Sequence, residues 1–273
     1  MRLTFIFLLV SFCALGQNTN GLKFIENKGQ WNSDIDFEAQ VPGGRVGVSA
    51  KGFSVLLLDL EEMEHRHLAS HGTINESDGQ RSSEPVTGHY FLINLIGSNS
   101  QAKAIVEKPL DGYTNYFLGS DSCRWATNVK AYASILYQNV YDGIDFRVSS
   151  SGNNLKYDFI VRPEADPSQI KIEYCGVDGI EKINSSLKIE TNVGLLTEVI
   201  PFSYQLDDNN TRQIVASEYN LQNKATSFSF PNDYDECRTL VIDPLLIFST
   251  YSGSTADNWG STATPGEHGT LYS

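Results

Sequence analysis

Hydrophobic and polar positions alternate most clearly in residues 113–162. Apolar residues occupy every second position from Ile144 to Val148, and the same period returns from Leu155 to Val161. A Ser-Gly-Asn-Asn segment separates the two runs. A period of two places successive side chains on opposite faces of a strand, and segments rich in Gly and Asn form tight turns. This pattern therefore predicts a β-hairpin.

Two registers keep the apolar faces of this hairpin together. The first places Arg147 opposite Lys156, and it also opposes Asp145 to Asp158. The second places Arg147 opposite Asp158. Directly opposed charges contribute roughly 0.2–1 kcal/mol, favourable for unlike charges and unfavourable for like charges. We therefore predict the second register.

Further short runs of apolar residues indicate strands along most of the chain, and no segment shows a long helical period. Residues 50–52 form a turn between two of them, and residues 89–96 have the apolar character of a central strand. Short strands at these intervals are typical of β-sandwiches. The predicted fold is all-β, an antiparallel β-sandwich-like domain with one sheet or two sub-sheets. The predicted strands are 46–49, 53–60, 89–96, 104–106, 144–149, 155–161, 170–174, 187–191, 195–205, 213–221, 227–230 and 239–243, the last ended by Pro244.

The first sixteen residues have the pattern of a secretory signal peptide. Arg2 supplies a positive charge, residues 3–10 are apolar, and Ala-Leu-Gly at 14–16 provides small residues for cleavage before Gln17. A membrane anchor would need about 20 apolar residues, and the polar residues 17–20 follow too soon. We therefore expect a secreted or outer-surface protein without a transmembrane segment.

Cleavage would remove Cys13 and leave Cys123, Cys175 and Cys237. An oxidising compartment permits a disulfide, but three cysteines cannot all pair within one chain. At most one bridge can form, and the sequence does not decide whether these cysteines include one. We interpret them as buried free thiols that act as small hydrophobic side chains.

The net charge of the chain bears on whether it binds nucleic acid. Its 33 acidic and 20 basic residues give a formal net charge of −13. Phosphate groups would be repelled by such a surface, so a nucleic-acid partner is not expected.

Residues 61–87 interrupt the strand pattern with a charged segment rich in Ser and Gly, which predicts a flexible excursion. His65, His67 and His71 form the chain's histidine cluster. In a helix, His67 and His71 would share a face at a spacing that zinc sites use. The His-Glu-x-x-His pattern is absent, however, so we interpret the segment as a solvated loop and assign no metal.

Acidic residues are numerous, but their positions predict no active site. Turns and hairpin faces account for Asp142, Asp145 and Asp158, and no Gly-x-Ser-x-Gly elbow is present. Asp207 and Asp208 with Asp142 and Asp145 could offer oxygen ligands to calcium, although the twelve-residue EF-hand pattern is absent. Calcium stays a hypothesis. We assign no catalytic residue, no metal site and no cofactor, and the binding residues are unknown.

The three tryptophans are the remaining candidates for function. If Trp31, Trp125 or Trp259 were exposed in one patch, the patch would favour binding to glycan. Aromatic residues more often fill protein cores. Glycan binding is therefore a hypothesis that depends on their exposure.

Several motifs together resemble a known family, the β-rich N-terminal domain of unknown function in large bacterial surface proteins. They are residues 24–31, Tyr-Phe-Leu-Gly at 116–119, Trp-Ala-Thr-Asn-Val at 125–129, 140–145, Tyr-Asp-Phe-Ile-Val at 157–161, 165–170 and Val-Ile-Asp-Pro at 241–244. In that family the domain precedes SBBP-type β-propeller repeats. Bacteroidetes members often continue into PKD-like modules and a gliding-motility-associated C-terminal region with a type IX secretion signal.

The resemblance implies a signal peptide over 1–16, a β-rich extracellular domain over 17–245 and the start of a truncated β-propeller-type repeat region over 246–273. It implies a non-enzymatic extracellular or cell-surface module at the N-terminus of a larger secreted protein, with a structural or adhesive role or a part in surface assembly. Its partners would be the downstream propeller and PKD-like modules and a surface glycan or protein. The alternative is a hydrolase, or a glycan-binding accessory module of a secreted enzyme.

Overall fold

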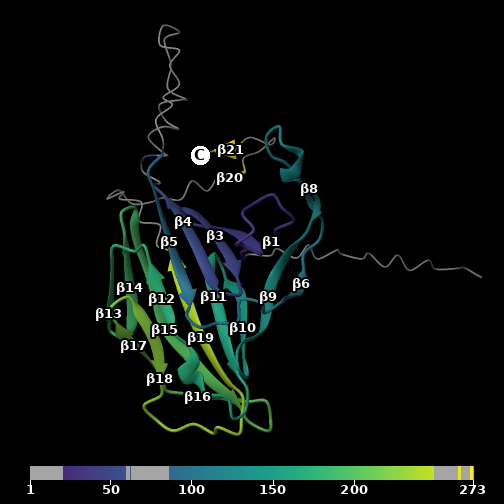
Figure 1. Ribbon diagram of the computed structural model, residues 1–273. Helices are drawn as coiled ribbons and strands as arrows, with labels where there is room; N and C mark the ends of the chain where they lie inside the picture. Colours follow the sequence, from purple (N-terminus) through teal and green to yellow (C-terminus); the bar gives the residue numbers. More distant parts are fainter. Residues whose placement is uncertain (1–20, 60–61, 63–85, 249–263, 266–270, 273) are drawn as a thin grey trace, which may run out of the picture.

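The computed structural model describes residues 21–59, 62, 86–248, 264–265 and 271–272. The fold is all-β, with a large, nearly closed antiparallel sheet and small two-stranded sheets beside it (Figure 1). The strands are β1 (Phe24–Glu26), β2 (Phe37–Val41), β3 (Gly44–Ser49), β4 (Gly52–Leu58), β5 (Gly88–Leu95), β6 (Ala104–Pro109), β7 (Thr114–Phe117), β8 (Trp125–Val129), β9 (Ala131–Tyr141), β10 (Ile144–Ser151), β11 (Asn154–Val161), β12 (Ile172–Cys175), β13 (Gly179–Ile183), β14 (Ser186–Thr191), β15 (Gly194–Leu206), β16 (Arg212–Val215), β17 (Glu218–Gln222), β18 (Ala225–Ser229), β19 (Leu240–Phe248), β20 (Thr264–Pro265) and β21 (Leu271–Tyr272), with short 3-10 turns η1 (Ser122–Arg124) and η2 (Pro167–Gln169).

The hydrogen-bonded neighbours follow one path around the large sheet. The order is β17-β18-β12-β5-β4-β3-β2-β1-β9-β10-β11-β19-β15-β14-β13, and each of these pairs is antiparallel. Strand β6 lies on the other side of β9, and β16 pairs with the C-terminal part of β15. The two ends of the path meet where the Lys182 ammonium on β13 donates to the Tyr219 carbonyl on β17, at 2.8 Å.

The two halves of this sheet face each other across an aromatic core. The ring of Phe53 on β4 lies 5.6 Å from that of Phe146 on β10 and 5.4 Å from that of Tyr157 on β11. Phe159 on β11 packs against Phe228 on β18, with ring centroids 5.9 Å apart. The alternation of apolar residues along these strands therefore places one face of each strand in a common core.

The predicted hairpin register is confirmed. Strands β10 and β11 pair with Arg147 opposite Asp158 and Ile144 opposite Val161. The side-chain partner of the arginine, however, lies on another strand, because the Arg147 Nε atom is 3.1 Å from the Glu107 carboxylate on β6. The register is therefore as predicted, but the ion pair used to predict it is replaced by others: Arg147 reaches across β9 to Glu107, and Asp158 is paired with Lys156.

The predicted end of the last strand is wrong. Strand β19 continues through Pro244 to Phe248 instead of stopping at Asp243. Proline has no N–H to donate and is tolerated in a sheet at bulges and edges. The pairing with β15 is irregular opposite Pro244, between Val199 and Phe202, so the ladder is interrupted where the donor is missing.

The predicted strand over residues 213–221 is divided into β16 and β17. Between them, the hydroxyl of Ser217 donates to the Pro201 carbonyl at 3.0 Å and lies 2.7 Å from the hydroxyl of Ser203. Ser217 is buried. The bend therefore places the Ser217 hydroxyl where it can donate to a backbone carbonyl in the irregular part of β15.

The interpretation of the cysteines as buried residues is wrong for two of them. Cys123 and Cys237 are exposed, and Cys175 is half-buried. All three are free thiols. Cys123 lies in η1 and Cys237 in the loop before β19, so neither belongs to a strand whose inner face packs into the core.

Some expectations fall outside the described residues. These are the signal peptide over 1–16, the cluster of His65, His67 and His71, and most of residues 246–273. Within the latter, Leu246 and Phe248 are buried at the end of β19. The domain boundary at 245 stays a prediction. Among the described residues, no helix has the length and apolar character needed to cross a membrane.

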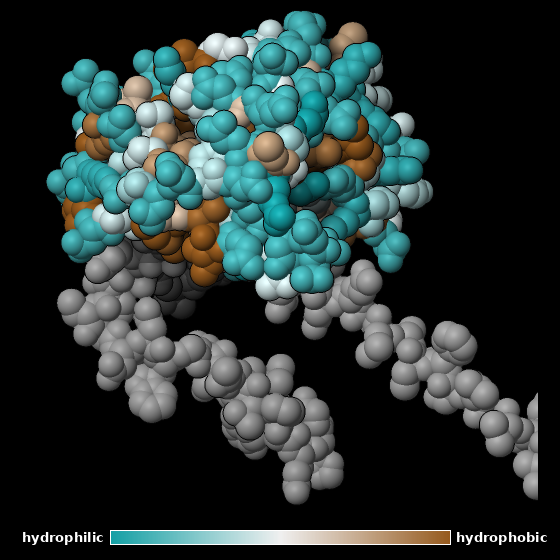
Figure 2. Space-filling model, turned by 90° about the horizontal axis from the view of Figure 1, so that it is seen from below, coloured by the Kyte–Doolittle hydropathy of each residue, from teal (hydrophilic) through white to brown (hydrophobic). Residues whose placement is uncertain are grey.

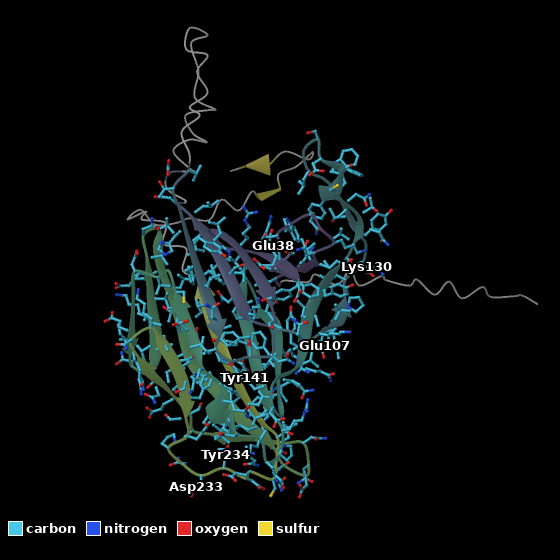
Figure 3. The ribbon with its side chains drawn as sticks, in the orientation of Figure 1. Glu38, Glu107, Lys130, Tyr141, Asp233 and Tyr234 are labelled. Atoms are coloured by element: carbon cyan, nitrogen blue, oxygen red, sulfur yellow. The ribbon has the colours of Figure 1, made fainter. Side chains whose placement is uncertain are left out.

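The end of the molecule where β16 and β18 lie has a mainly hydrophilic surface. Figure 2 shows this end with hydrophobic areas that are small and separated. Asp233 and Tyr234 lie here, while Glu38 lies towards the opposite end, where hairpin β7–β8 projects (Figures 1 and 3).

A buried carboxylate connects the two halves of the sheet. Glu198 on β15 is fully buried and accepts hydrogen bonds from three tyrosine hydroxyls: Tyr157 on β11 at 2.7 Å, Tyr174 on β12 at 2.8 Å and Tyr219 on β17 at 2.9 Å. Burial raises the pKa of Glu198, and the three hydrogen bonds lower it, but burial has the larger effect. The carboxylate thus joins β11 and β15 to β12 and β17 through polar contacts inside the core.

Removing this carboxylate should strongly destabilise the fold. We expect Glu198→Ala to lower the free energy of unfolding by about 3–5 kcal/mol, because buried hydroxyls lose their acceptor. Urea denaturation measures this change. Glu190→Ala is the matched control, since Glu190 is half-exposed. Glu190→Ala removes a surface ion pair with Lys188. Apart from that loss, it should change the free energy of unfolding by less than about 0.5 kcal/mol. Equal effects of the two substitutions would contradict the assignment.

The charge of Glu198 also predicts a pH dependence. Its pKa lies above the ordinary 4.5 in the folded protein, so the folded state binds the proton more tightly than the unfolded chain. This contribution to stability is fully present below about pH 4.5 and is lost as pH rises through the folded-state pKa. Glu198→Gln removes the titration. The variant should therefore gain stability relative to wild type as pH rises, in urea unfolding at a series of pH values. A difference that does not change with pH would exclude this role.

Candidate binding groove

A groove of about 540 Å³ lies on the outer face of strands β2–β5. Its volume falls within the range of about 300–1,000 Å³ that small-molecule sites commonly occupy. The residue types around it combine aromatic rings, amides and charges of both signs. The side chains around it include those of Trp31, Glu38, Arg45, Lys51, Tyr90 and Asn94.

The loop over residues 27–36 forms one wall, and its own side chains fix its shape. The Asn27 carboxamide donates to the carbonyls of Asn32 and Ile35, both at 2.8 Å, and accepts from the N–H of Gly29 at 3.0 Å. The fully buried Gln30 donates to the Glu26 carbonyl at 2.7 Å. Because these bonds replace regular ladder pairing, the loop holds a defined conformation beside the sheet.

Gly47 allows this loop to approach the sheet. A Cβ atom at this position would lie 2.6 Å from the Cγ2 atom of Ile35 and would also collide with the hydroxyl of Ser54. The small residues Gly47 and Ser54 are cross-strand partners on β3 and β4. Because both side chains are small, the groove is deeper at this point and Ile35 can pack against the sheet.

Trp31 is held at the edge of the groove by a second aromatic ring. It packs edge-to-face on Tyr116 of β7, with ring centroids 5.4 Å apart. Burial raises the pKa of Tyr116, and the negative charge of Glu38 raises it further, which places this phenol beside the groove carboxylate. The hairpin β7–β8 therefore supports the tryptophan from behind.

The groove contains both signs of charge. Arg45 lies 4.0 Å from Glu38, a separation at the limit of an ion pair. Burial raises the pKa of Glu38, and the positive charge of Arg45 lowers it less. Within the described part of the chain, the Lys51 ammonium and the Tyr90 hydroxyl make no hydrogen bond or ion pair. These groups are free to bind a ligand.

This arrangement suits an uncharged, polyhydroxylated ligand. An aromatic ring offers an apolar face to the C–H groups of a sugar, while amides and charged groups bind its hydroxyls. The opposed charges of Arg45 and Glu38 leave no strong preference for an ion. The groove therefore offers an apolar ring face and hydrogen-bonding groups side by side.

The structure does not bring Trp31 and Trp125 into one patch, the condition under which the sequence would favour glycan binding. Trp31 borders the groove, and Trp125 lies on β8 against Phe117, with ring centroids 5.5 Å apart. Tyr116 and Phe117 are successive residues of β7, so they point to opposite faces of the hairpin. Trp31 and Trp125 therefore belong to different surfaces, and Trp259 lies outside the described residues.

The acidic residues considered from the sequence are also divided. Asp145 is paired with Arg162, and Asp207 accepts from the N–H groups of Asn209 and Thr211 in its own turn. Asp208 is paired with Arg238. The structure describes no group of three or more His, Cys, Asp or Glu residues that could hold a metal ion within its ranges. The four proposed calcium ligands thus form no common site there.

Most groove residues gave no signal in the sequence. Arg45, Lys51 and Asn94 come from different strands or turns and share no motif. Tyr90 had a weak signal, because it is a large aromatic residue on the outward side of an alternating strand, and its exposed fraction is 60%. Only strand pairing brings these positions together.

The close approach at Gly47 generates a test of the groove's construction. We expect Gly47→Ala to lower the free energy of unfolding by about 1–3 kcal/mol, because the added methyl group forces Ile35 off the sheet. The fluorescence of Trp31 should shift to longer wavelength as its loop moves into water. Adding Ile35→Ala should recover part of both changes, as expected for residues in contact. Strictly additive effects would contradict the contact.

The comparisons with known proteins place most of the chain in one family. A family described as a domain of unknown function, DUF7948, matches residues 24–245, which include the groove and strands β1 to β18. Neither the search of curated proteins nor the search of solved structures gave a match. Since the matched region covers most of the chain, the protein belongs to the DUF7948 family of domains of unknown function.

Proposed function

We propose that this chain is a non-enzymatic extracellular or cell-surface module at the N-terminus of a larger secreted protein, with an adhesive role exerted through the groove. The observation that carries the proposal is the fixed position of Trp31 beside polar side chains that have unused hydrogen-bonding capacity. An all-β scaffold with a rigid outer face presents such a site without any movement on binding. The ligand class is a neutral surface glycan.

The acidity of the chain favours neutral over anionic glycans. The net charge is −13, so a uronic or sulfated polysaccharide would approach against a repulsive field. Inside the groove, positive and negative groups are present together. Hydroxyl groups, which both donate and accept hydrogen bonds, match that combination better than a negatively charged group does.

The wider architecture that we propose follows from the N-terminal and C-terminal residues. Residues 1–16 have the pattern of a signal peptide. Residues 246–273 would begin a repeat region of the SBBP type, and propeller and PKD-like modules with a type IX secretion signal of the gliding-motility-associated kind would belong to the same protein. In this arrangement the DUF7948 domain stands at the head of a surface protein.

A glycan-binding accessory module of a secreted hydrolase is the second candidate, because the same groove would serve it. A glycosidase site would need two carboxyl groups about 5–9.5 Å apart across the bound sugar. The groove holds Glu38 and Asp34 as acids. Incubation of the chain with polysaccharides, followed by a reducing-sugar assay, separates the two candidates, since an adhesive module leaves the polymer intact.

The role of Trp31 can be tested by binding. On a glycan array followed by calorimetry with the best neutral oligosaccharide, we expect Trp31→Ala to raise the Kd at least about tenfold, as loss of a central aromatic contact does. Trp125→Ala is the matched control, since Trp125 lies on the other face of the hairpin, and its Kd should match wild type. Absence of binding to any glycan, or equal losses in both variants, would refute the proposal.

A further inference from the structure

Lys156, Asp158 and Asp243 form a cluster that the groove does not use. The Lys156 Nζ atom lies 2.5 Å from an oxygen of Asp158 and 2.8 Å from an oxygen of Asp243. The carboxylates of both aspartates are mostly buried, with 10% and 14% of their side-chain surface exposed, and Lys156 is 28% exposed. An amine and two carboxyl groups are thus in contact and largely shielded from water.

The cluster bridges two neighbouring strands. Lys156 and Asp158 belong to β11, and Asp243 belongs to β19. The β11–β19 ladder pairs Lys156 with Leu245 and resumes only at Phe159 and Ile242. The missing pairs include the position of Pro244, so backbone hydrogen bonds are interrupted beside the cluster.

We propose that Lys156 and Asp243 form an intramolecular isopeptide bond, which links β11 covalently to β19, and that Asp158 carries the proton in this reaction. The three groups already have the required contacts. Two reacting groups that a fold holds in the right orientation react as if one of them were present at an effective concentration of up to about 10⁵–10⁸ M. The arrangement makes an amide attainable that free amines and carboxylic acids do not form in water.

The reaction balances without any further reagent. The Lys156 ammonium gives one proton to the Asp158 carboxylate and becomes an amine. Its lone pair attacks the Cγ atom of the protonated Asp243 carboxyl, a new C–N bond forms, and the C–O bond to the hydroxyl group breaks. That hydroxyl leaves as water with a second proton from the nitrogen, and Asp158 keeps the first. The products are one amide, one water and one neutral carboxyl group.

The surroundings favour the reactive, neutral form of Asp243 more than they favour the reactive, neutral form of Lys156. Burial raises the pKa of Asp243, the bond from Lys156 lowers it, and the nearby negative charge of Asp158 raises it again. The pKa stays above its ordinary value, which favours the neutral carboxyl that an amine can attack. Burial lowers the pKa of Lys156, but its bonds to both aspartates outweigh this and keep it raised. The amine is therefore a minor form. A reaction that each molecule completes once needs only a minor form, because an amide that is largely shielded from water is hydrolysed slowly and the product therefore accumulates.

The bond would reinforce the strand that carries the chain out of the domain. Strand β19 lies between β11 and β15 and is the last strand of the large sheet. A force applied to the chain after Phe248 acts first on β19. A covalent link beside Pro244 would hold this strand where its backbone ladder is weakest.

Intact-mass spectrometry of the full chain tests the proposal. We expect the mass to be lower by one water molecule than the sequence from the observed N-terminus requires. A proteolytic digest should contain a branched peptide that joins the segment with Lys156 to the segment with Asp243. A full-length mass without water loss, after prolonged incubation of the folded protein, would overturn the proposal.

Matched variants locate the bond. Lys156→Arg and Asp243→Ala should each restore the lost water, and Asp158→Asn should leave most molecules unlinked while conserving the shape of the side chain. Lys188→Arg is the control, because Lys188 also contacts two carboxylates, Glu181 and Glu190, but at the surface. It should keep the water loss. Water loss that persists in Lys156→Arg, or that maps to a linear peptide, would assign it to another reaction and overturn the proposal.

Discussion

The contact on which the fold most depends is that of the Glu198 carboxylate with three buried tyrosine hydroxyls. It is a polar contact inside a largely apolar core, and a buried charge is costly unless donors surround it. Tyr157, Tyr174 and Tyr219 provide those donors from strands on both halves of the sheet. Since the hydroxyls and the carboxylate satisfy one another only when both halves are in place, this cluster favours one packing of the sheet over others. The aromatic contacts of Phe53 with Phe146 and Tyr157 fill the space beside it.

The rigid core explains why a groove can form on the outer face of β2–β5. The strands hold Gly47 and Ser54 side by side, and the missing side-chain volume accepts Ile35 from the loop before β2. That loop carries Trp31, which Tyr116 supports from the neighbouring hairpin. The groove therefore depends on three separate parts of the chain, and none of them would form it alone.

The ion pairs of this protein depend on side-chain length as well as on which residues are opposite each other in the sheet. Arg147 is opposite Asp158 in the hairpin, yet its side chain bonds Glu107 across β9. Asp158 instead contacts Lys156, two residues along its own strand, and both are close to Asp243. Side chains two residues apart share a face of a strand, and a neighbouring strand brings a third residue to the same face. This geometry produces the lysine and aspartate cluster.

The sequence by itself determined the all-β class and most strand positions, because these depend on local alternation and turn residues. Alternation left two registers open for the β10–β11 hairpin, and the signs of the opposed charges selected the one that the structure has. The sequence did not determine the path of β19 through Pro244, since a bulge on the partner strand β15 accommodates that proline. Nor did it determine the exposure of Cys123 and Cys237. The groove around Trp31, the tyrosine cluster at Glu198 and the cluster at Lys156 were decided by the tertiary structure alone. Each unites residues from strands distant in sequence, and only long-range pairing sets which side chains share a face.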